Sequence, residues 1–167
     1  MEKIHFRKAR TEDGREILRI YDESIHYDDA TYLTQCPSWK QWDNEHDSNY
    51  RIVADLEGKV VGFVTVSDVN CEKESTVEIS IYVDRRYRHT GIGYMLLQCL
   101  IHYNSLLEES SCNSFCVFHS IIFTNNIASI RLHEKAGFQR VEYRKNSLSK
   151  NGKWRDVYVY EHRNRVV

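Results

Sequence analysis

Apolar residues recur along the chain with two different spacings. In some segments they alternate with polar residues, which is typical of a strand with one buried face. In others they return after three or four residues, which is typical of an amphipathic helix. These patterns predict strands at residues 4–8, 51–55, 60–69, 76–83, 115–123, 138–143 and 157–162. They predict helices at 13–27, 92–107 and 126–135, with a loop and a short helix in 28–49.

Capping and turn residues indicate where several of these elements begin and end. Asp13 stands three residues before Glu16, which is the spacing of a capping box, and Gly137 follows the last helix as a C-terminal glycine. Glycine turns at 57–58 and 151–152 each join two strands into a hairpin. The predicted inner face of helix 92–107 consists of Ile92, Met95, Leu96, Cys99, Leu100, Tyr103 and Leu107.

The order of the elements predicts an α+β (mixed αβ) fold, a sheet flanked by helices. The chain has 167 residues, one proline and no repeat or linker, so residues 1–167 are predicted to form a single domain. In strand 76–83, Glu78, Ser80 and Tyr82 share one face because successive side chains point to opposite sides. A polar face on a strand inside a sheet indicates a functional surface.

Composition and charge exclude several classes of protein. Apolar residues make up 41% and charged residues 28%, as in globular proteins, and no apolar run approaches the roughly 18 residues of a membrane helix. Residues 1–83 contain 10 basic and 17 acidic residues, whereas residues 84–167 contain 13 and 7. This asymmetry indicates either a charged partner or two solvated charged faces. Nucleic acid is not an expected partner, because no element carries a dense basic stripe.

The five cysteines predict a cytoplasmic protein. They are odd in number and irregularly spaced, which is typical of free thiols in a reducing compartment. Cys112 and Cys116 lack a second pair at zinc-binding spacing, so no metal site is expected.

The segment between strand 76–83 and helix 92–107 predicts a phosphate site. Gly91 and Gly93 let the backbone approach a ligand closely, and the N–H groups at a helix start have no acceptor within the helix. Such a helix start binds phosphate oxygens, and a pyrophosphate suits it best. The segment is not a nucleotide P-loop, because no Lys-Ser/Thr follows the last glycine, and its glycine spacing excludes a dinucleotide fingerprint. Three nearby basic residues add positive charge: Arg85, Arg86 and Arg88.

Two segments together resemble the GNAT superfamily of N-acetyltransferases. Arg88-x-x-Gly91-x-Gly93 after Val83 is similar to the loop that binds the pyrophosphate of acyl-CoA in that superfamily, and residues 126–138 (NIASIRLHEKAGF) are similar to its next helix. The resemblance implies a twisted mixed sheet of about six or seven strands, splayed at an acyl-CoA cleft between strands 76–83 and 115–123.

Finer features resemble the phosphinothricin acetyltransferase-like branch, which acetylates small amines similar to amino acids. They are Glu78 before Tyr82, His133 in place of a tyrosine, and the segments 29–32 (DATY) and 152–157 (GKWRDV). The resemblance implies acetyl-CoA as co-substrate. It also implies these acetyl-CoA-binding residues: Ile81, Tyr82, Val83, Arg88, His89, Thr90, Gly91, Ile92, Gly93, Asn126 and Ser129.

The reaction implied by the resemblance is direct attack of a neutral amine on the acetyl thioester. An alkylamine of pKa about 10.4 is almost entirely protonated at pH 7, which costs roughly 4 kcal/mol unless a base removes the proton. Glu78 is the candidate base, directly or through a water. His133 is a candidate either to share proton removal or to protonate the departing thiolate. The candidate acceptor-binding residues are Thr31, Tyr32 and Trp154.

Several properties of the acceptor and the assembly stay open at this point. By analogy with related proteins, the segment around Trp154 lies near a homodimer interface. Some relatives hold the substrate carboxylate with two arginines, and the corresponding positions here are Glu74 and Asp84. We therefore hypothesise an acceptor other than phosphinothricin or methionine sulfoximine, and a cationic amine is one candidate. The alternatives are an acetyltransferase acting on a protein N-terminus or lysine, and a non-catalytic acyl-CoA-binding sensor.

Overall fold

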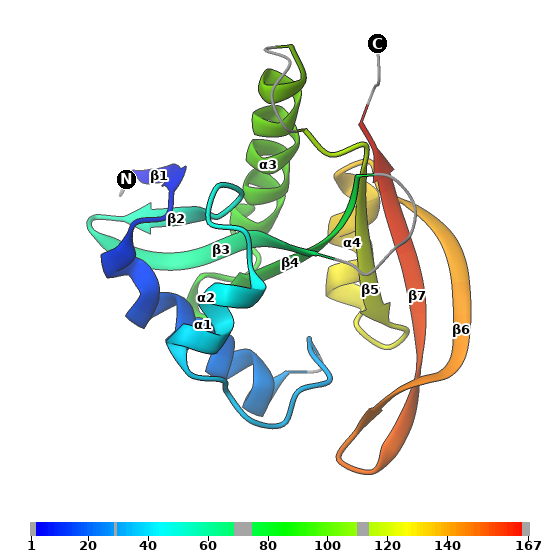
Figure 1. The fold of residues 1–167 in the computed structure, drawn as a ribbon. Helices are drawn as coiled ribbons and strands as arrows, with labels where there is room; N and C mark the ends of the chain where they lie inside the picture. The colour runs from blue at the N-terminus through cyan, green and yellow to red at the C-terminus, as the bar shows by residue number, and fades with distance from the viewer. Residues whose placement is uncertain (1–2, 29, 69–74, 110–113, 165–167) are drawn as a thin grey trace.

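The computed structural model describes residues 3–28, 30–68, 75–109 and 114–164, and in these ranges the chain forms one seven-stranded sheet with helices on both faces (Figure 1). The predicted mixed αβ fold is confirmed. The strands are β1 (Ile4–Lys8), β2 (Ile52–Leu56), β3 (Lys59–Asp68), β4 (Thr76–Val83), β5 (Val117–Phe123), β6 (Gln139–Lys150) and β7 (Lys153–Arg163). The α-helices are α1 (Gly14–Tyr27), α2 (Trp39–Glu45), α3 (Ile92–Glu109) and α4 (Ile127–Lys135).

The topology places an opening in the middle of the sheet. The strand order is β1-β2-β3-β4-β5-β7-β6, and every neighbouring pair is antiparallel except β4 and β5. These two parallel strands pair only between Thr76–Glu78 and residues 117–119. Beyond Glu78 they diverge, as the ribbon shows (Figure 1). The predicted splay between these two strands is therefore present.

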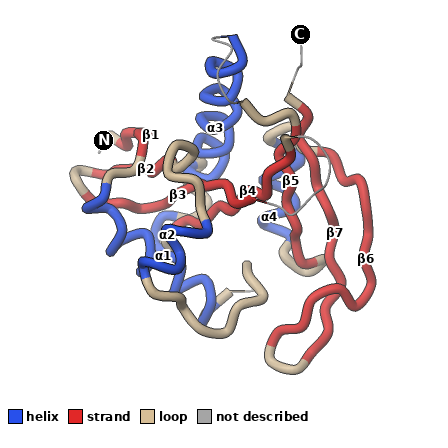
Figure 2. Tube along the Cα trace, in the orientation of Figure 1, coloured by secondary structure: helices blue, strands red, loops and turns tan. Residues whose placement is uncertain are grey.

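Two cores hold the helices against opposite faces of the sheet (Figure 2). α1 and α2 pack on one face, where Ile17, Trp42 and Phe63 are almost fully buried. α3 and α4 pack on the other face, around Leu96 and Leu100. Burial of each such side chain stabilises the fold by about 1.5–3 kcal/mol. Among the described residues, no helix is both long and apolar enough to cross a membrane.

The buried face of α3 differs from the predicted one. Met95 is 43% exposed, whereas Leu97 and Asn104 are fully buried. Asn104 occupies an apolar-face position because its Oδ1 accepts hydrogen bonds from the Phe115 N–H at 2.8 Å and from the Tyr50 hydroxyl at 3.0 Å. A buried amide with partners of this kind ties α3 to the segments before β2 and β5. The spacing of apolar residues along the sequence could not reveal that Asn104 is buried.

The predicted start of α1 is correct to within one residue, but its predicted side-chain cap is not present, and the predicted bounds of the last two strands were wrong. Asp13 does not cap α1 with its side chain, because its carboxylate accepts hydrogen bonds from the Arg10 N–H at 2.6 Å and from the Arg7 guanidinium at 2.7 Å. β6 and β7 are much longer than predicted and meet at the turn 151–152. Their outer half is polar and is interrupted by a register shift between Arg144 and Leu148, so the sequence lacks a clear alternation there.

Candidate active site

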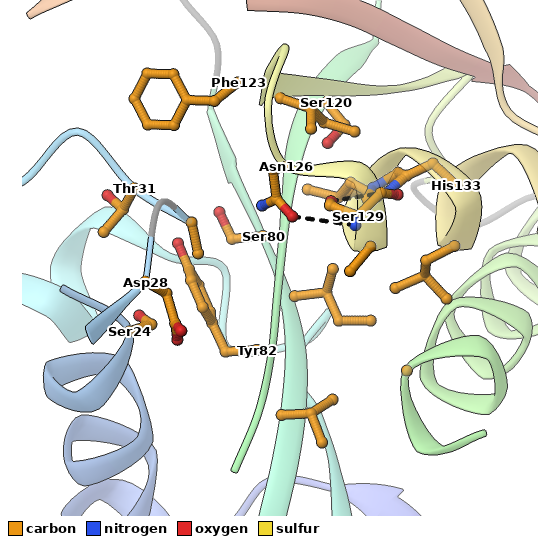
Figure 3. A pocket seen from close by; sticks show the side chains of 18 of the residues that line it. Ser24, Asp28, Thr31, Ser80, Tyr82, Ser120, Phe123, Asn126, Ser129 and His133 are labelled. Atoms are coloured by element: carbon orange, nitrogen blue, oxygen red, sulfur yellow. Dashed lines mark hydrogen bonds between the residues drawn. The ribbon is translucent and has the colours of Figure 1, made fainter. Parts of the chain in front are cut away.

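A cleft of about 1170 Å³ opens where β4 and β5 diverge. We call its two walls the α1–α2 side, formed by the end of α1, residues 30–33 and the end of α2, and the phosphate-loop side, formed by residues 87–94 and α4. Figure 3 shows both walls, with Thr31 and Asp28 facing Asn126 and Ser129 across β4. The predicted site residues that line the cleft are Thr31, Tyr32, Glu78, Ile81, Tyr82, Val83, Arg88, His89, Gly91, Ile92, Gly93, Asn126, Ser129 and His133.

Two predicted site residues lie outside the cleft. Thr90 is exposed, and its hydroxyl donates a hydrogen bond to the Tyr87 carbonyl at 2.6 Å within the loop. Trp154 is 64% exposed and pairs with Ser149 in the β6–β7 hairpin. The prediction that Trp154 forms a wall of the acceptor pocket is therefore not met within a single chain.

The phosphate loop requires glycine at positions 91 and 93 for two different physical reasons. Gly91 has a φ of +88°, a left-handed conformation that favours glycine, and a Cβ there would meet no atom within 4 Å. A Cβ on Gly93 would lie 3.1 Å from the Leu132 side chain of α4. Gly91 therefore shapes an open turn at the start of α3, whereas Gly93 allows α3 and α4 to approach each other.

The three arginines expected at the phosphate site have other partners. Arg88 donates from Nη1 to Asp28 at 2.9 Å and from Nε to the Val83 carbonyl at 3.1 Å. Arg86 forms an ion pair with the carboxylate of Asp84 at 2.6 Å. Arg85 lies over the Tyr27 ring at 5.0 Å. Because the Arg88 guanidinium is held by an acidic residue, the structure does not direct it towards a phosphate.

Two other cationic side chains line the phosphate-loop side instead. They are Arg131 and Lys135 of α4, and His89 of the loop also borders the cleft. The Lys135 ammonium lies 4.7 Å from the centre of the Tyr94 ring. The sequence did not single out Arg131 and Lys135 because they lie about forty residues beyond the glycine motif, on a helix whose place beside the loop depends on the tertiary fold.

The edge of β4 that faces β5 is the main backbone surface of the cleft. β3 pairs with one edge of β4 along residues 77–83, whereas no described strand pairs with the other edge beyond Glu78. Backbone groups on such an edge can bind an extended ligand in the manner of an added strand. The Val83 carbonyl already accepts the hydrogen bond from Arg88, so this atom is less available than predicted.

Glu78 lies where the two strands part. Burial raises the pKa of its carboxyl above the ordinary value. Among the described residues, no side chain forms an ion pair or hydrogen bond with it. Its in-register neighbours are Ser67 on β3 and His119 on β5. A carboxylate in this environment binds a proton more strongly than an exposed glutamate does, which suits a general base.

His133 is buried in the wall formed by α4. Only 1% of its surface is exposed, and burial lowers its pKa to about 4. Its Nδ1 lies 2.8 Å from the Ser129 carbonyl, which places the proton on Nδ1, while its Nε2 has no hydrogen-bond partner among the described groups. The Asn126 side chain caps the same helix, accepting from the Ser129 N–H at 3.2 Å (Figure 3). His133 is therefore a neutral imidazole at pH 7.

The α1–α2 side carries aromatic and acidic groups. Tyr82 packs edge-on against Tyr21 at 5.1 Å and projects towards the loop that carries Thr31 (Figure 3). Tyr32 also lines this side, although half of its surface is exposed. Sequence reasoning missed Glu45 and His46, which reach the cleft from the end of α2. No motif covers these two residues, so only the fold identifies them.

Positions 74 and 84, where some relatives have arginines that hold the substrate carboxylate, are acidic in this chain. Asp84 is 1% exposed, and its carboxylate is held by Arg19 at 2.8 Å and Arg86 at 2.6 Å outside the cleft. Glu74 lies outside the described residues.

Comparisons with known proteins agree with this arrangement. Residues 12–138 match the model of the acetyltransferase (GNAT) family. The chain is 29% identical to L-methionine sulfoximine/L-methionine sulfone acetyltransferase from Pseudomonas aeruginosa, over 90% of this chain and 89% of the relative. It resembles a GNAT superfamily phosphinothricin acetyltransferase from Sinorhizobium meliloti in complex with AcCoA, with a TM-score of 0.79, 27% identity and coverage of 96% and 88%.

The name of a third similar protein refers to a protein as the acceptor. It is a ribosomal-protein-alanine N-acetyltransferase from Brucella melitensis, with a TM-score of 0.80, 28% identity and coverage of 95% of this chain and 99% of the other. The family match covers most of the chain, and the cleft contains the loop, the helix and the splayed strands that the two motifs imply. The chain is therefore an acyltransferase that belongs to the GNAT acetyltransferase family.

Proposed function

We propose that the protein transfers an acetyl group from acetyl-CoA to the amine of a small molecule. The observation that carries this proposal is the position of Glu78, a partly buried carboxylate without a described partner, at the point where β4 and β5 separate. The helix start at Gly91 lies along the same cleft, so a proton acceptor and a phosphate site share one cavity.

In the proposed reaction the amine nitrogen attacks the thioester carbonyl, the C–S bond breaks and CoA leaves as a thiolate. Glu78 takes the proton that the attacking ammonium must lose. Removing this proton offsets the roughly 4 kcal/mol that an alkylamine otherwise loses at pH 7. Because burial raises the pKa of Glu78, the carboxylate is a stronger base than an exposed glutamate.

The proposed acetyl-CoA site combines backbone and side-chain groups. The N–H groups at the start of α3 bind the pyrophosphate, and the open edge of β4 at Ile81 and Tyr82 binds the pantetheine arm. Arg131 and Lys135 of α4 supply positive charge to the phosphates. Arg88 contributes by holding Asp28, and we do not assign it a phosphate contact.

His133 stays a predicted catalytic residue, and the structure favours one of its two expected roles. A group with a pKa of about 4 carries no extra proton at pH 7, so His133 is unsuited to protonating the thiolate. The Nε2 lone pair of the neutral ring has no partner among the described groups and can accept a hydrogen bond, but a pKa of about 4 makes the ring a weak base. We therefore propose that His133 assists proton removal as a hydrogen-bond acceptor rather than as the base itself.

Mass-spectrometric detection of CoA and acetylated products tests the proposal directly. The protein and acetyl-CoA are mixed with amino acids, polyamines, sulfoximines and short peptides. We expect product from small amines, and Glu78→Gln should lower kcat by about 10²–10⁴-fold with acetyl-CoA affinity retained. Glu57→Gln is the matched control, because it removes the same charge in the exposed β2–β3 turn, beyond the far end of β3 from Ser67.

The pH dependence provides a second measurement. The value of kcat/KM should fall as the pH drops through the raised pKa of Glu78, because protonation removes the base. In Glu78→Gln this fall in kcat/KM at low pH should be absent. The same fall in the variant would contradict the assignment of Glu78 as the base.

Two other functions predict different outcomes. An acetyltransferase acting on proteins, favoured by the likeness to the ribosomal-protein-alanine enzyme, should acetylate only the peptides. It should also respond mildly to Glu78→Gln, since an α-amino group has a pKa of only about 7.7–8.0. A sensor should bind acetyl-CoA without transferring the acetyl group to any amine.

We also propose that the protein acts in the cytoplasm as a homodimer and without a metal. Cys36, Cys99 and Cys116 are free thiols, which suits a reducing compartment. The β6–β7 hairpin exposes Tyr143 and Trp154, and such apolar side chains are typical of protein interfaces. Light scattering on Trp154→Ser and on the unaltered protein tests the dimer. Unchanged activity after treatment with EDTA is expected for the metal-free reaction.

A further inference from the structure

We propose that the acceptor is an aliphatic amine with a second cationic group, of the diamine or polyamine class, and that Glu45 binds this second group. The inference rests on the proposed function, because it assigns the substrate class of the same cleft. Glu45 is then a specificity-determining residue, and Glu78 receives the proton of the attacking amine.

The first reason is that two carboxylates in the cleft have no cationic partner. Of the three described acidic residues that line it, Asp28 is paired with Arg88. Glu45, which is exposed, and the half-buried Glu78 have no ion pair or hydrogen bond within the described part of the chain. Asp43, two residues before Glu45, is by contrast paired with Arg51 at 2.8 Å.

The second reason is the position of Glu45 relative to Glu78. The Asp47 N–H, two residues after Glu45, donates a hydrogen bond to the Val66 carbonyl at 2.9 Å. The next residue of β3, Ser67, is the in-register neighbour of Glu78. The end of α2 is thus anchored beside the stretch of β4 that carries the proposed base. The proposal places a short aliphatic chain between these two carboxylates, with an amine at each end.

The third reason is the lack of a group that could bind a substrate carboxylate on the α1–α2 side. No described Lys or Arg lines that wall. His46 lines it, but burial lowers its pKa, and its Nδ1 donates to the Trp42 carbonyl at 2.6 Å. Arg155 lies over the Phe123 ring at 5.2 Å and is not among the residues that line the cleft.

Aromatic side chains on the same wall favour a cation further. Tyr21, Tyr27, Tyr32 and Tyr82 all border the cleft. Aromatic ring faces attract ammonium groups, and their apolar surface accommodates the methylene chain between two amines. An α-amino acid with an uncharged side chain offers no second cation for Glu45, and the carboxylate of any α-amino acid would face two carboxylates of the same sign.

Three acceptors of similar size test the inference: 1,4-diaminobutane, n-pentylamine and 4-aminobutanoate. They differ only in whether the end remote from the reacting amine is cationic, apolar or anionic. We expect kcat/KM for the diamine to exceed both other values by at least about tenfold, since hydrogen bonds to charged groups typically contribute about that much or more. Glu45→Gln should lower the ratio of diamine to n-pentylamine about tenfold, mainly by raising the KM of the diamine.

The controls separate this inference from the proposed function. Glu57→Gln should leave the ratio unchanged, because it removes a charge far from the cleft. Equal or faster acetylation of n-pentylamine, 4-aminobutanoate or methionine sulfoximine overturns the inference and leaves the proposed function intact. A diamine preference that Glu45→Gln does not change overturns the role of Glu45. Acetylation of peptides alone, or of no amine, overturns both the inference and the proposed function.

Discussion

The two walls of the cleft are built in different ways. The phosphate-loop side contributes backbone groups from one short segment, the left-handed Gly91 and the helix start that follows it, and α4 packs beside them. The α1–α2 side consists of side chains from separate segments, among them Tyr21, Thr31 and Glu45. The glycine loop is a local feature of the chain, whereas the α1–α2 side, like the position of α4, exists only in the folded protein.

This difference explains what each wall can recognise. Backbone N–H groups at a helix start bind phosphate oxygens whatever the neighbouring side chains are, so that wall suits a group common to all acyl-CoA molecules. A wall made of side chains changes its preference when single residues change. Acceptor preference is therefore expected to depend on the α1–α2 side, where the family resemblance points to Thr31 and Tyr32 but not to Glu45.

The largest effect should follow from a change in the phosphate loop. Gly91→Asp places a negative charge and a side chain at a turn with a φ of +88°, and we expect the Kd for acetyl-CoA to rise by about a thousandfold. Titration calorimetry measures the change. Gly58→Asp is a matched control, because Gly58 has a φ of +87° and equally open surroundings in the β2–β3 turn.

The control separates ligand binding from backbone strain. Both substitutions add the same side chain to a left-handed residue, so both should lose similar stability. Only Gly91→Asp should lose acetyl-CoA. Equal affinity for acetyl-CoA in the two variants would show that the phosphate loop does not bind acetyl-CoA. The two walls would then not differ in the way described above.

A smaller effect concerns His133, the buried side chain of the phosphate-loop side. In the unfolded chain a histidine takes up a proton below a pH of about 6.5, whereas the folded protein resists this until about pH 4. Acidification through this window therefore favours the unfolded state. The resulting loss in the free energy of unfolding is about 3 kcal/mol, and it should be absent in His133→Phe.

Urea denaturation at pH 7 and pH 4 measures that difference. His46, His119 and His162 also have lowered pKa values, but they are present in both proteins and cancel in the comparison. The same loss in both proteins would show that His133 is protonated in the fold. In that case the phosphate-loop side would contain a titrating side chain near the reaction.

The sequence predicted the elements that depend on local patterns. The strands around Glu78 and the helix start after Gly91 were placed correctly, because alternation and glycine spacing are properties of short segments. It failed where distant segments meet. The burial of Asn104 depends on Tyr50 and Phe115, and the partner of Arg88 is sixty residues away at Asp28. For the same reason no sequence pattern pointed to Glu45. Trp154 was predicted to line the acceptor pocket, but it lies outside the cleft.

The smallest expected effect concerns the ion pair that joins the two walls. Arg88 of the loop binds Asp28, which follows α1, and the Asp28 carbonyl also accepts a hydrogen bond from Lys150 at 2.7 Å. Asp28→Asn removes the ion pair but keeps the backbone bond, so the fold should persist. A partly buried pair contributes about 1 kcal/mol, and we expect the KM of the amine to rise about fivefold.

The effect on acetyl-CoA affinity shows which wall the ion pair between Asp28 and Arg88 stabilises. If Asp28 and Arg88 serve to hold the α1–α2 side, Asp28→Asn should change the Kd for acetyl-CoA less than twofold while the KM of the amine rises. Asp22→Asn is the matched control, because it neutralises an exposed carboxylate that lies 3.1 Å from His26 on the same helix, and it should change neither constant. A loss of acetyl-CoA affinity equal to the rise in KM would mean that the loop needs Asp28 to hold its own shape. The walls would then be coupled through Arg88, and the acceptor side could not change its residues without affecting the phosphate site.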